Sequence, residues 1–288
     1  MLDEFERYYL AFCLEAKGEG ELKIGALHKR FSHGPFGEMT IGAQTLRDSK
    51  RQEIFAYFHP GDLKPPLNIY FSGYRPAEGF EGFVMMRRMG SPFILFSDPR
   101  LEGGSFYMGS QELEDQIVAY IDQHLDWLGF GPKEMNFSGL SMGTFGALYY
   151  GASYSPHAIL VGKPIINLGD VAANLKFKRP DEFGTSLDMM QLLVGQVSRE
   201  GIDLLNQRFW NRFNQADLKD TILALAYMRD DDYDQLAYPK ILEALYDHPV
   251  RIISSSRPGR HNDATAPIVE WFLTQYKEIM ERDFGRIE

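Results

Sequence analysis

The residue best suited to chemistry is Ser141, which lies in the run GLSMG at positions 139–143. In this G-x-S-x-G pattern a serine occupies a sharp turn between a strand and a helix, so that its hydroxyl is exposed for nucleophilic attack. A mostly apolar run at 135–137 precedes the pattern, and the mostly small residues at 143–147 suit the start of a helix. An ordinary glycine-rich turn is the alternative, because the pattern alone is only moderately specific.

A serine hydroxyl needs a neighbouring base, and the base needs an acid that orients it. In enzymes with this pattern the partners follow in the chain order serine, acid, histidine. Of the seven histidines, only His248 and His261 come late enough. His261 follows the last expected strand and would emerge at the same sheet edge as Ser141, whereas His248 precedes that strand. We therefore expect His261 to be the base.

The acid is expected after the penultimate strand, where residues 229–234 read RDDDYD. Asp231 is favoured because many such enzymes carry an apolar anchor two residues after the acid, and Tyr233 fits that place. Asp230 is the alternative. The acid would hold the imidazole in the correct tautomer and stabilise its cation. The two remaining aspartates, Asp232 and Asp234, are expected to cap the following helix near Pro239.

Backbone N–H groups must also stabilise the oxyanion that forms during acyl transfer. One donor is expected from Met142, directly after the nucleophile, and the second from Tyr74 in the glycine-rich loop 72–82. The chemistry requires no metal and no organic cofactor, and the sequence leaves the acyl donor open. Candidates for contact with the substrate are Gly73, Arg75, Lys163 and Asn167, with Arg179, Asp181 and Glu182 as further open positions.

The elements that must position these residues alternate between short apolar runs and helical stretches, which is typical of βαβ units. Near-continuous apolar runs fit strands buried on both faces. Helices are expected at 110–128, with Ser110 as N-cap, and at 264–282. We predict one α/β-hydrolase domain over 1–288, with a mostly parallel sheet and helices on both faces. Strands are expected at 67–72, 92–97, 135–138, 157–162, 220–227 and 249–255.

Two further regions complete the expected domain. Residues 1–60 should add a helix at 3–16 and two or three strands within 21–58, with Cys13 as a buried thiol on the helix. The charged stretch 168–219 is too long for a simple crossover and is interpreted as a helical cap inserted over the sheet. A single cysteine excludes an internal disulfide.

The composition of the chain limits the kinds of partner and the location that we expect for it. The formal charge of −10 and a pI near 5.3 argue against nucleic acid, because such a chain repels phosphate. No run approaches the roughly 18 apolar residues of a membrane span, and the N-terminus lacks the order of a signal peptide. These features favour a cytoplasmic location.

Several longer runs resemble the accessory Sec system protein family that assists export of serine-rich-repeat adhesins in streptococci and related bacteria. They include FHPGDLKPPLNIYFSGYRPAEGFEG, SDPRLEGGSFYMG, GLSMGTFGALYYG and AYMRDDDYD. The resemblance implies an α/β-hydrolase-like O-acetyltransferase that modifies N-acetylglucosamine on the adhesin, with Ser141, Asp231 and His261 where the family's triad would lie. It also implies work beside other accessory Sec proteins and the export motor, with peripheral association at the inner face of the membrane.

Two rival functions remain open at this point. A carbohydrate esterase would use the same three residues, since the triad does not distinguish transfer from hydrolysis. A non-catalytic adaptor for the adhesin would instead use surface tyrosines such as Tyr149, Tyr150 and Tyr154. Family members are longer at the N-terminus, so membership of the complete export complex stays a separate question.

Overall fold

The computed structural model describes residues 13, 15–21, 42–75, 79–101, 103–178 and 182–286. The helix predicted at 3–16 and the strands predicted before residue 42 fall mostly outside these residues. Cys13 is described and is exposed, so the prediction of a buried thiol is wrong.

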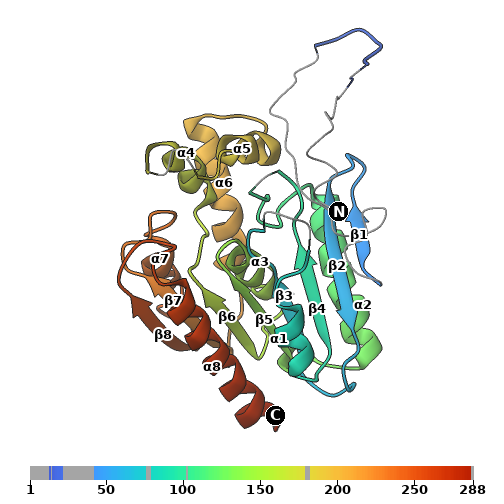
Figure 1. Cartoon of the computed structure of the whole chain (residues 1–288), viewed down its shortest axis with the longest axis vertical. Helices are drawn as coiled ribbons and strands as arrows, with labels where there is room; N and C mark the ends of the chain where they lie inside the picture. Colours follow the sequence, from blue (N-terminus) through green and yellow to red (C-terminus); the bar gives the residue numbers. More distant parts are fainter. Residues whose placement is uncertain are drawn as a thin grey trace, which may run out of the picture.

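An eight-stranded sheet forms the centre of the molecule (Figure 1). Its strands follow the order β1-β2-β4-β3-β5-β6-β7-β8. Strands β3 to β8 run parallel, and β2 is antiparallel to both of its neighbours, β1 and β4. All six predicted strands are confirmed, with ends shifted by about two residues at most. The strands are β1 (Gln44–Arg47), β2 (Glu53–His59), β3 (Leu67–Phe71), β4 (Phe93–Ser97), β5 (Met135–Leu140), β6 (Ala158–Gly162), β7 (Ile222–Met228) and β8 (Arg251–Arg257).

Helices cover both faces of the sheet because successive strand residues point to opposite sides. On β4, Ile94 belongs to one buried cluster with residues of α2, α3 and α7, whereas Leu95 belongs to a second cluster with residues of α1 and α8. Ser110 caps α2 by accepting a hydrogen bond from the Leu113 N–H at 3.2 Å, as predicted. These helices are α1 (Phe83–Arg88), α2 (Gln111–Leu128), α3 (Met142–Gly151), α7 (Ala237–Ala244) and α8 (Thr265–Phe284), with a 3₁₀ turn η3 (Pro132–Glu134) before β5.

Three helices lie between β6 and β7, and we call residues 168–213 the cap. They are α4 (Leu168–Lys178), α5 (Ser186–Val194) and α6 (Arg199–Phe213). Figure 1 shows them gathered beyond one end of the sheet, with α6 reaching back toward α3.

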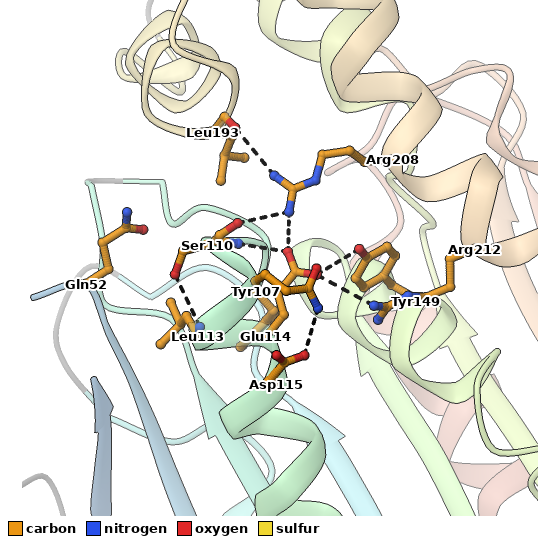
Figure 2. Close-up of polar contacts among 12 residues, drawn as sticks. Gln52, Tyr107, Ser110, Leu113, Glu114, Asp115, Tyr149, Leu193, Arg208 and Arg212 are labelled. Carbon is orange, nitrogen blue, oxygen red and sulfur yellow. Dashed lines mark hydrogen bonds and ion pairs between the residues drawn. The ribbon is translucent and has the colours of Figure 1, made fainter. Parts of the chain in front are cut away.

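A buried carboxylate joins the cap to helices α2 and α3 (Figure 2). Glu114 of α2 is 1% exposed and pairs with the guanidinium of Arg208 from α6. It also accepts hydrogen bonds from the Tyr149 hydroxyl at 2.9 Å and the Gly109 N–H at 3.1 Å. Because a buried carboxylate is stable only when its charge and lone pairs are satisfied, this cluster fixes α6 on α2 and α3.

Candidate active site

Ser141 occupies the turn between β5 and α3 in a strained conformation. Its φ of 51° and ψ of −119° lie outside the regions that non-glycine residues ordinarily adopt. The flanking glycines make the turn possible, since a Cβ on Gly139 would lie 2.3 Å from the carbonyl oxygen of Gly143. A Cβ on Gly143 would lie 2.0 Å from the carbonyl oxygen of Phe71 in β3. Strand, turn and helix therefore meet as the sequence pattern predicts.

The structure brings together the three side chains that the sequence singled out. The Ser141 Oγ lies 2.8 Å from Nε2 of His261, and Nδ1 of His261 lies 2.8 Å from Oδ2 of Asp231. His261 follows β8 and Asp231 follows β7, so all three residues stand at the carboxyl ends of parallel strands. His261 is 2% exposed and Asp231 is 5% exposed, which shields the hydrogen-bonded chain from water.

The surroundings of Asp231 keep its carboxylate ionised. Burial raises the pKa of Asp231, but the hydrogen bond to His261 and the charge of that imidazole lower it. The backbone N–H groups of Tyr233 and Asp234 also donate to Asp231 Oδ1, at 2.9 and 3.2 Å. The pKa of Asp231 consequently lies below its usual value. An ionised carboxylate here can stabilise a protonated imidazole.

Two neighbouring aspartates hold the histidine loop. Asp230, the alternative acid, accepts a hydrogen bond from the Gly259 N–H at 3.2 Å. Asp232 Oδ1 accepts from the backbone N–H of His261 at 3.1 Å. The geometry therefore pairs the imidazole with Asp231, while Asp230 and Asp232 join the loop after β7 to the loop after β8.

Asp234 ties the acid loop to the segment after β6. Its Oδ2 accepts the N–H groups of Ile166 and Asn167 at 2.8 and 2.7 Å. Burial raises the pKa of Asp234. Helix α7 has Leu236 at its N-cap and no side-chain cap, so the prediction that Asp232 and Asp234 cap this helix is wrong. Both carboxylates instead accept backbone N–H groups from other loops.

The two residues expected to supply oxyanion donors both belong to the surroundings of the serine pocket. Met142 is the first residue of α3, and Tyr74 lies in the loop after β3, 52% exposed. Both residues line the same pocket as Ser141. Glu81, which the sequence analysis missed, braces this loop: its Oε2 accepts from the Gly73 N–H at 2.7 Å and from the Tyr70 hydroxyl at 3.0 Å.

The pocket above Ser141 has a volume of about 440 Å³ and is closed partly by the cap. Phe183 enters from the cap and lies over Gly103, where a Cβ would come within 2.1 Å of its ring. The double glycine at 103–104 is the sequence signal that could have revealed this contact. Besides Ser141, Met142 and His261, side chains on the walls include Tyr74, Phe106, Ile165, Glu182, Phe183 and Tyr233.

The four main substrate candidates, Gly73, Arg75, Lys163 and Asn167, do not line this pocket. The Gly73 N–H is engaged by Glu81, and Arg75 donates to the Phe80 carbonyl at 3.4 Å. Lys163 and Asn167 are 5% and 1% exposed. Lys163 donates to the Thr265 hydroxyl at 3.0 Å, and Asn167 is bonded to Asp234 and Trp210. Glu182 does line the pocket, whereas Arg179 and Asp181 lie outside the described residues.

The described part of the chain lacks two features that would bear on cofactors and membranes. Within it, no three His, Cys, Asp or Glu side chains gather as metal ligands would. None of its helices is long and apolar enough to cross a membrane. The absence of a cofactor and the cytoplasmic location stay predictions.

The strand order and the parallel sheet define the α/β-hydrolase fold, and the serine turn, the aspartate and the histidine follow the chain order typical of that class. A model of the family described as "Accessory Sec system GspB-transporter" matches residues 2–286. The chain is 49% identical to an accessory Sec system protein of Staphylococcus aureus (strain NCTC 8325 / PS 47) over 280 residues, 97% of this chain. The chain belongs to this accessory Sec system family, as the resemblance indicated.

Solved structures agree with this assignment. A chain of the Glycosylation Associate Protein (Gap123) complex from Streptococcus agalactiae superposes with a TM-score of 0.84 at 46% identity, covering 87% of this chain and 48% of that chain. The capsule O-acetyltransferase of Neisseria meningitidis serogroup A gives a TM-score of 0.64 at 19% identity, covering 85% and 97%, and shares the fold. The aligned region makes up 54% of the S. aureus relative, so this chain spans about half the length of its relatives.

Proposed function

We propose that the chain is a serine-dependent O-acetyltransferase that acts on N-acetylglucosamine of serine-rich-repeat adhesins during accessory Sec export. The observation that carries the proposal is the hydrogen-bonded chain from Ser141 through His261 to Asp231, at 2.8 Å for each link. Membership of the accessory Sec system family supports the export setting. Likeness in fold to a capsule O-acetyltransferase supports acetyl transfer to a sugar.

The first step is acylation of the serine. His261 Nε2 takes the Ser141 proton as Oγ attacks the carbonyl carbon of the acetyl donor. Asp231 stabilises the imidazolium that forms. The N–H groups of Met142 and Tyr74 are the proposed donors to the oxyanion. His261 then protonates the leaving group, and an acetyl-serine remains.

The second step passes the acetyl group to a sugar hydroxyl. The cap and aromatic side chains line the pocket beside Ser141. A sugar bound against these walls would displace water from the acetyl-serine, which favours an alcohol as the acceptor. The proposed partners are the glycosylated adhesin, other accessory Sec proteins and the export motor, with peripheral association at the inner face of the membrane. Similarity to a chain of the Gap123 complex supports the partnership with accessory proteins.

A carbohydrate esterase is the second candidate function, because hydrolysis uses the same three side chains. The structure weakens the adaptor alternative in the form suggested by surface tyrosines. Tyr149 is 4% exposed and Tyr150 is fully buried, so neither offers a surface to a partner.

Labelling with a fluorophosphonate tests the proposal, since such probes phosphonylate activated serines. We expect labelling of the unmodified chain and its loss in Ser141→Ala and His261→Ala. Ser153→Ala is the matched control, because Ser153 is exposed and lies just beyond the far end of α3. In cells, Ser141→Ala should remove acetyl groups from the adhesin glycan. Labelling that survives Ser141→Ala would contradict the proposal.

A further inference from the structure

The cap places a carboxylate, that of Glu182, on the wall of the pocket that contains Ser141 and His261. Glu182 Oε2 accepts a hydrogen bond from the Tyr233 hydroxyl at 3.0 Å. The ring of Tyr233 lies 4.7 Å from the imidazole of His261, between centroids, at an interplanar angle of 51°. The Tyr233 side chain therefore links the Glu182 carboxylate to the proposed base.

Aromatic rings stand beside this carboxylate. Phe183 follows Glu182 in the chain, and its ring centroid lies 6.0 Å from that of Phe106. Tyr74 also lines the pocket and leaves half of its surface exposed. Aromatic faces bind the C–H surface of a ring compound, and a carboxylate accepts hydrogen bonds from its hydroxyl groups. The pairing suits an uncharged polyol.

We infer that Glu182 binds hydroxyl groups of the acceptor sugar and thereby directs the acetyl group to an alcohol instead of to water. The inference rests on the proposed acyl transfer at Ser141 and concerns its second step. Glu182 is an exposed residue on the pocket wall while its carboxylate accepts the Tyr233 hydroxyl, so hydroxyl groups of a sugar in the pocket can reach it.

The transfer of the acetyl group from Ser141 follows the same bond changes with a sugar or with water as the acceptor. The acceptor oxygen forms a bond to the acetyl carbon, and the bond from that carbon to Ser141 Oγ breaks. The acceptor proton passes to His261 Nε2 and from there to Ser141 Oγ. A sugar yields an acetylated sugar and water yields acetate, so the two reactions compete for one acetyl-serine.

Binding by Glu182 favours the sugar for two reasons. Charge-assisted hydrogen bonds are roughly twice as strong as neutral ones, so they retain the polyol in the pocket. An alcohol held in a reactive orientation also behaves as if its concentration were far above that in solution. Water gains from neither effect, because it has no second hydroxyl group by which Glu182 could retain and orient it in the pocket.

The ratio of acetylated sugar to acetate measures this competition. We would use the full chain with p-nitrophenyl acetate as donor and methyl N-acetyl-β-glucosaminide as acceptor, subtracting the background of Ser141→Ala. Both products come from the same acetyl-serine, so their ratio does not depend on the acylation rate or on the folded fraction. We expect the ratio to fall about tenfold or more in Glu182→Ala and less in Glu182→Gln.

Two controls isolate the carboxylate. Glu200→Gln removes a charge from an exposed position on the cap helix α6 and should leave the ratio unchanged. Methanol as acceptor carries no second hydroxyl, so its ratio of methyl acetate to acetate should not respond to Glu182→Ala. Tyr233→Phe keeps the ring but removes its hydrogen bond to Glu182, and should lower the sugar ratio by about threefold.

The outcomes separate the inference from the proposed function. A burst of p-nitrophenol with an unchanged sugar ratio in Glu182→Ala would overturn the inference and leave the serine chemistry standing. Hydrolysis alone in the unmodified chain would overturn the inference and would favour the esterase over the acetyltransferase. Absence of any Ser141-dependent release of p-nitrophenol would overturn the proposed function, and the inference with it.

Discussion

The two sides of the pocket are built differently. On the sheet side, Ser141, His261 and Asp231 are linked by hydrogen bonds, and aspartates from the same loop hold the backbone around them. On the cap side, Phe183 and Glu182 contribute a ring and an exposed carboxylate. Under the proposed function, the sheet edge supplies the reacting groups, and our inference assigns the choice of acceptor to the cap.

Neutralising the acid, Asp231, gives the strongest test of the idea that the sheet side controls reactivity. Asp231→Asn keeps the shape of the side chain but favours the wrong imidazole tautomer, so the turnover of p-nitrophenyl acetate should fall by about 10⁴-fold. The matched variant Asp230→Asn should change turnover only slightly, because Asp230 bonds to Gly259 and not to the imidazole. Equal losses in both variants would show that the acid has been assigned wrongly.

Glycines provide a second comparison between the two sides. Gly143→Ala forces a Cβ to within 2.0 Å of a β3 carbonyl, and should lower the free energy of unfolding by about 1–3 kcal/mol or more. Gly184→Ala on the cap should change it little, since the added Cβ would meet no atom of the described residues within 4 Å. Urea unfolding of the two variants checks this prediction, and a larger loss for Gly184→Ala would contradict it.

Substitution of Glu81 tests whether the loop after β3 must be held in place for the Tyr74 N–H to act as a donor. Glu81→Ala removes the acceptor of the Gly73 N–H, so the neighbouring Tyr74 donor should lose its alignment. We expect kcat to fall by about 10- to 100-fold with KM little changed, and Glu81→Gln to recover part of the loss. Steady-state kinetics measure both constants. A rise in KM at constant kcat would mean that this loop binds the substrate and does not stabilise the oxyanion.

The smallest effect concerns pH. Because the folded pKa of Asp231 lies below its value of about 3.8 in the unfolded chain, its ionised form stabilises the fold. That stabilisation is complete above the unfolded pKa and is lost as the pH falls through the folded pKa. The difference in the free energy of unfolding between the unmodified chain and Asp231→Asn should therefore shrink from pH 7 to pH 3. A constant difference would show that ionisation of Asp231 contributes nothing to stability.

Much of the sheet side could be predicted from the sequence. Buried parallel strands are nearly continuous apolar runs, and a parallel sheet places residues that follow its strands at one edge. That reasoning located Ser141 and His261 without a structure. The choice among three consecutive aspartates needed a weaker rule about the anchoring residue, and geometry pairs His261 with Asp231.

The errors have a common physical cause. Asp232 and Asp234 were predicted as helix caps from local propensity, but tertiary contacts took precedence and both bond to backbone N–H groups of distant loops. The packing of Phe183 on Gly103 likewise joins segments far apart in the chain. The glycine pair at 103–104 indicates that another group packs closely there, but the sequence does not show that this group is Phe183.

The close approach of Gly143 to Phe71 has a consequence for the evolution of this fold. The two peptide groups touch with no side chain between them, so the turn that bears the nucleophile and the strand that leads to the second N–H donor form one rigid unit. This contact is made by backbone atoms of the serine turn and of β3. Under the proposed acyl transfer, sequence change in the cap helices would alter acceptor recognition while this backbone contact stays in place.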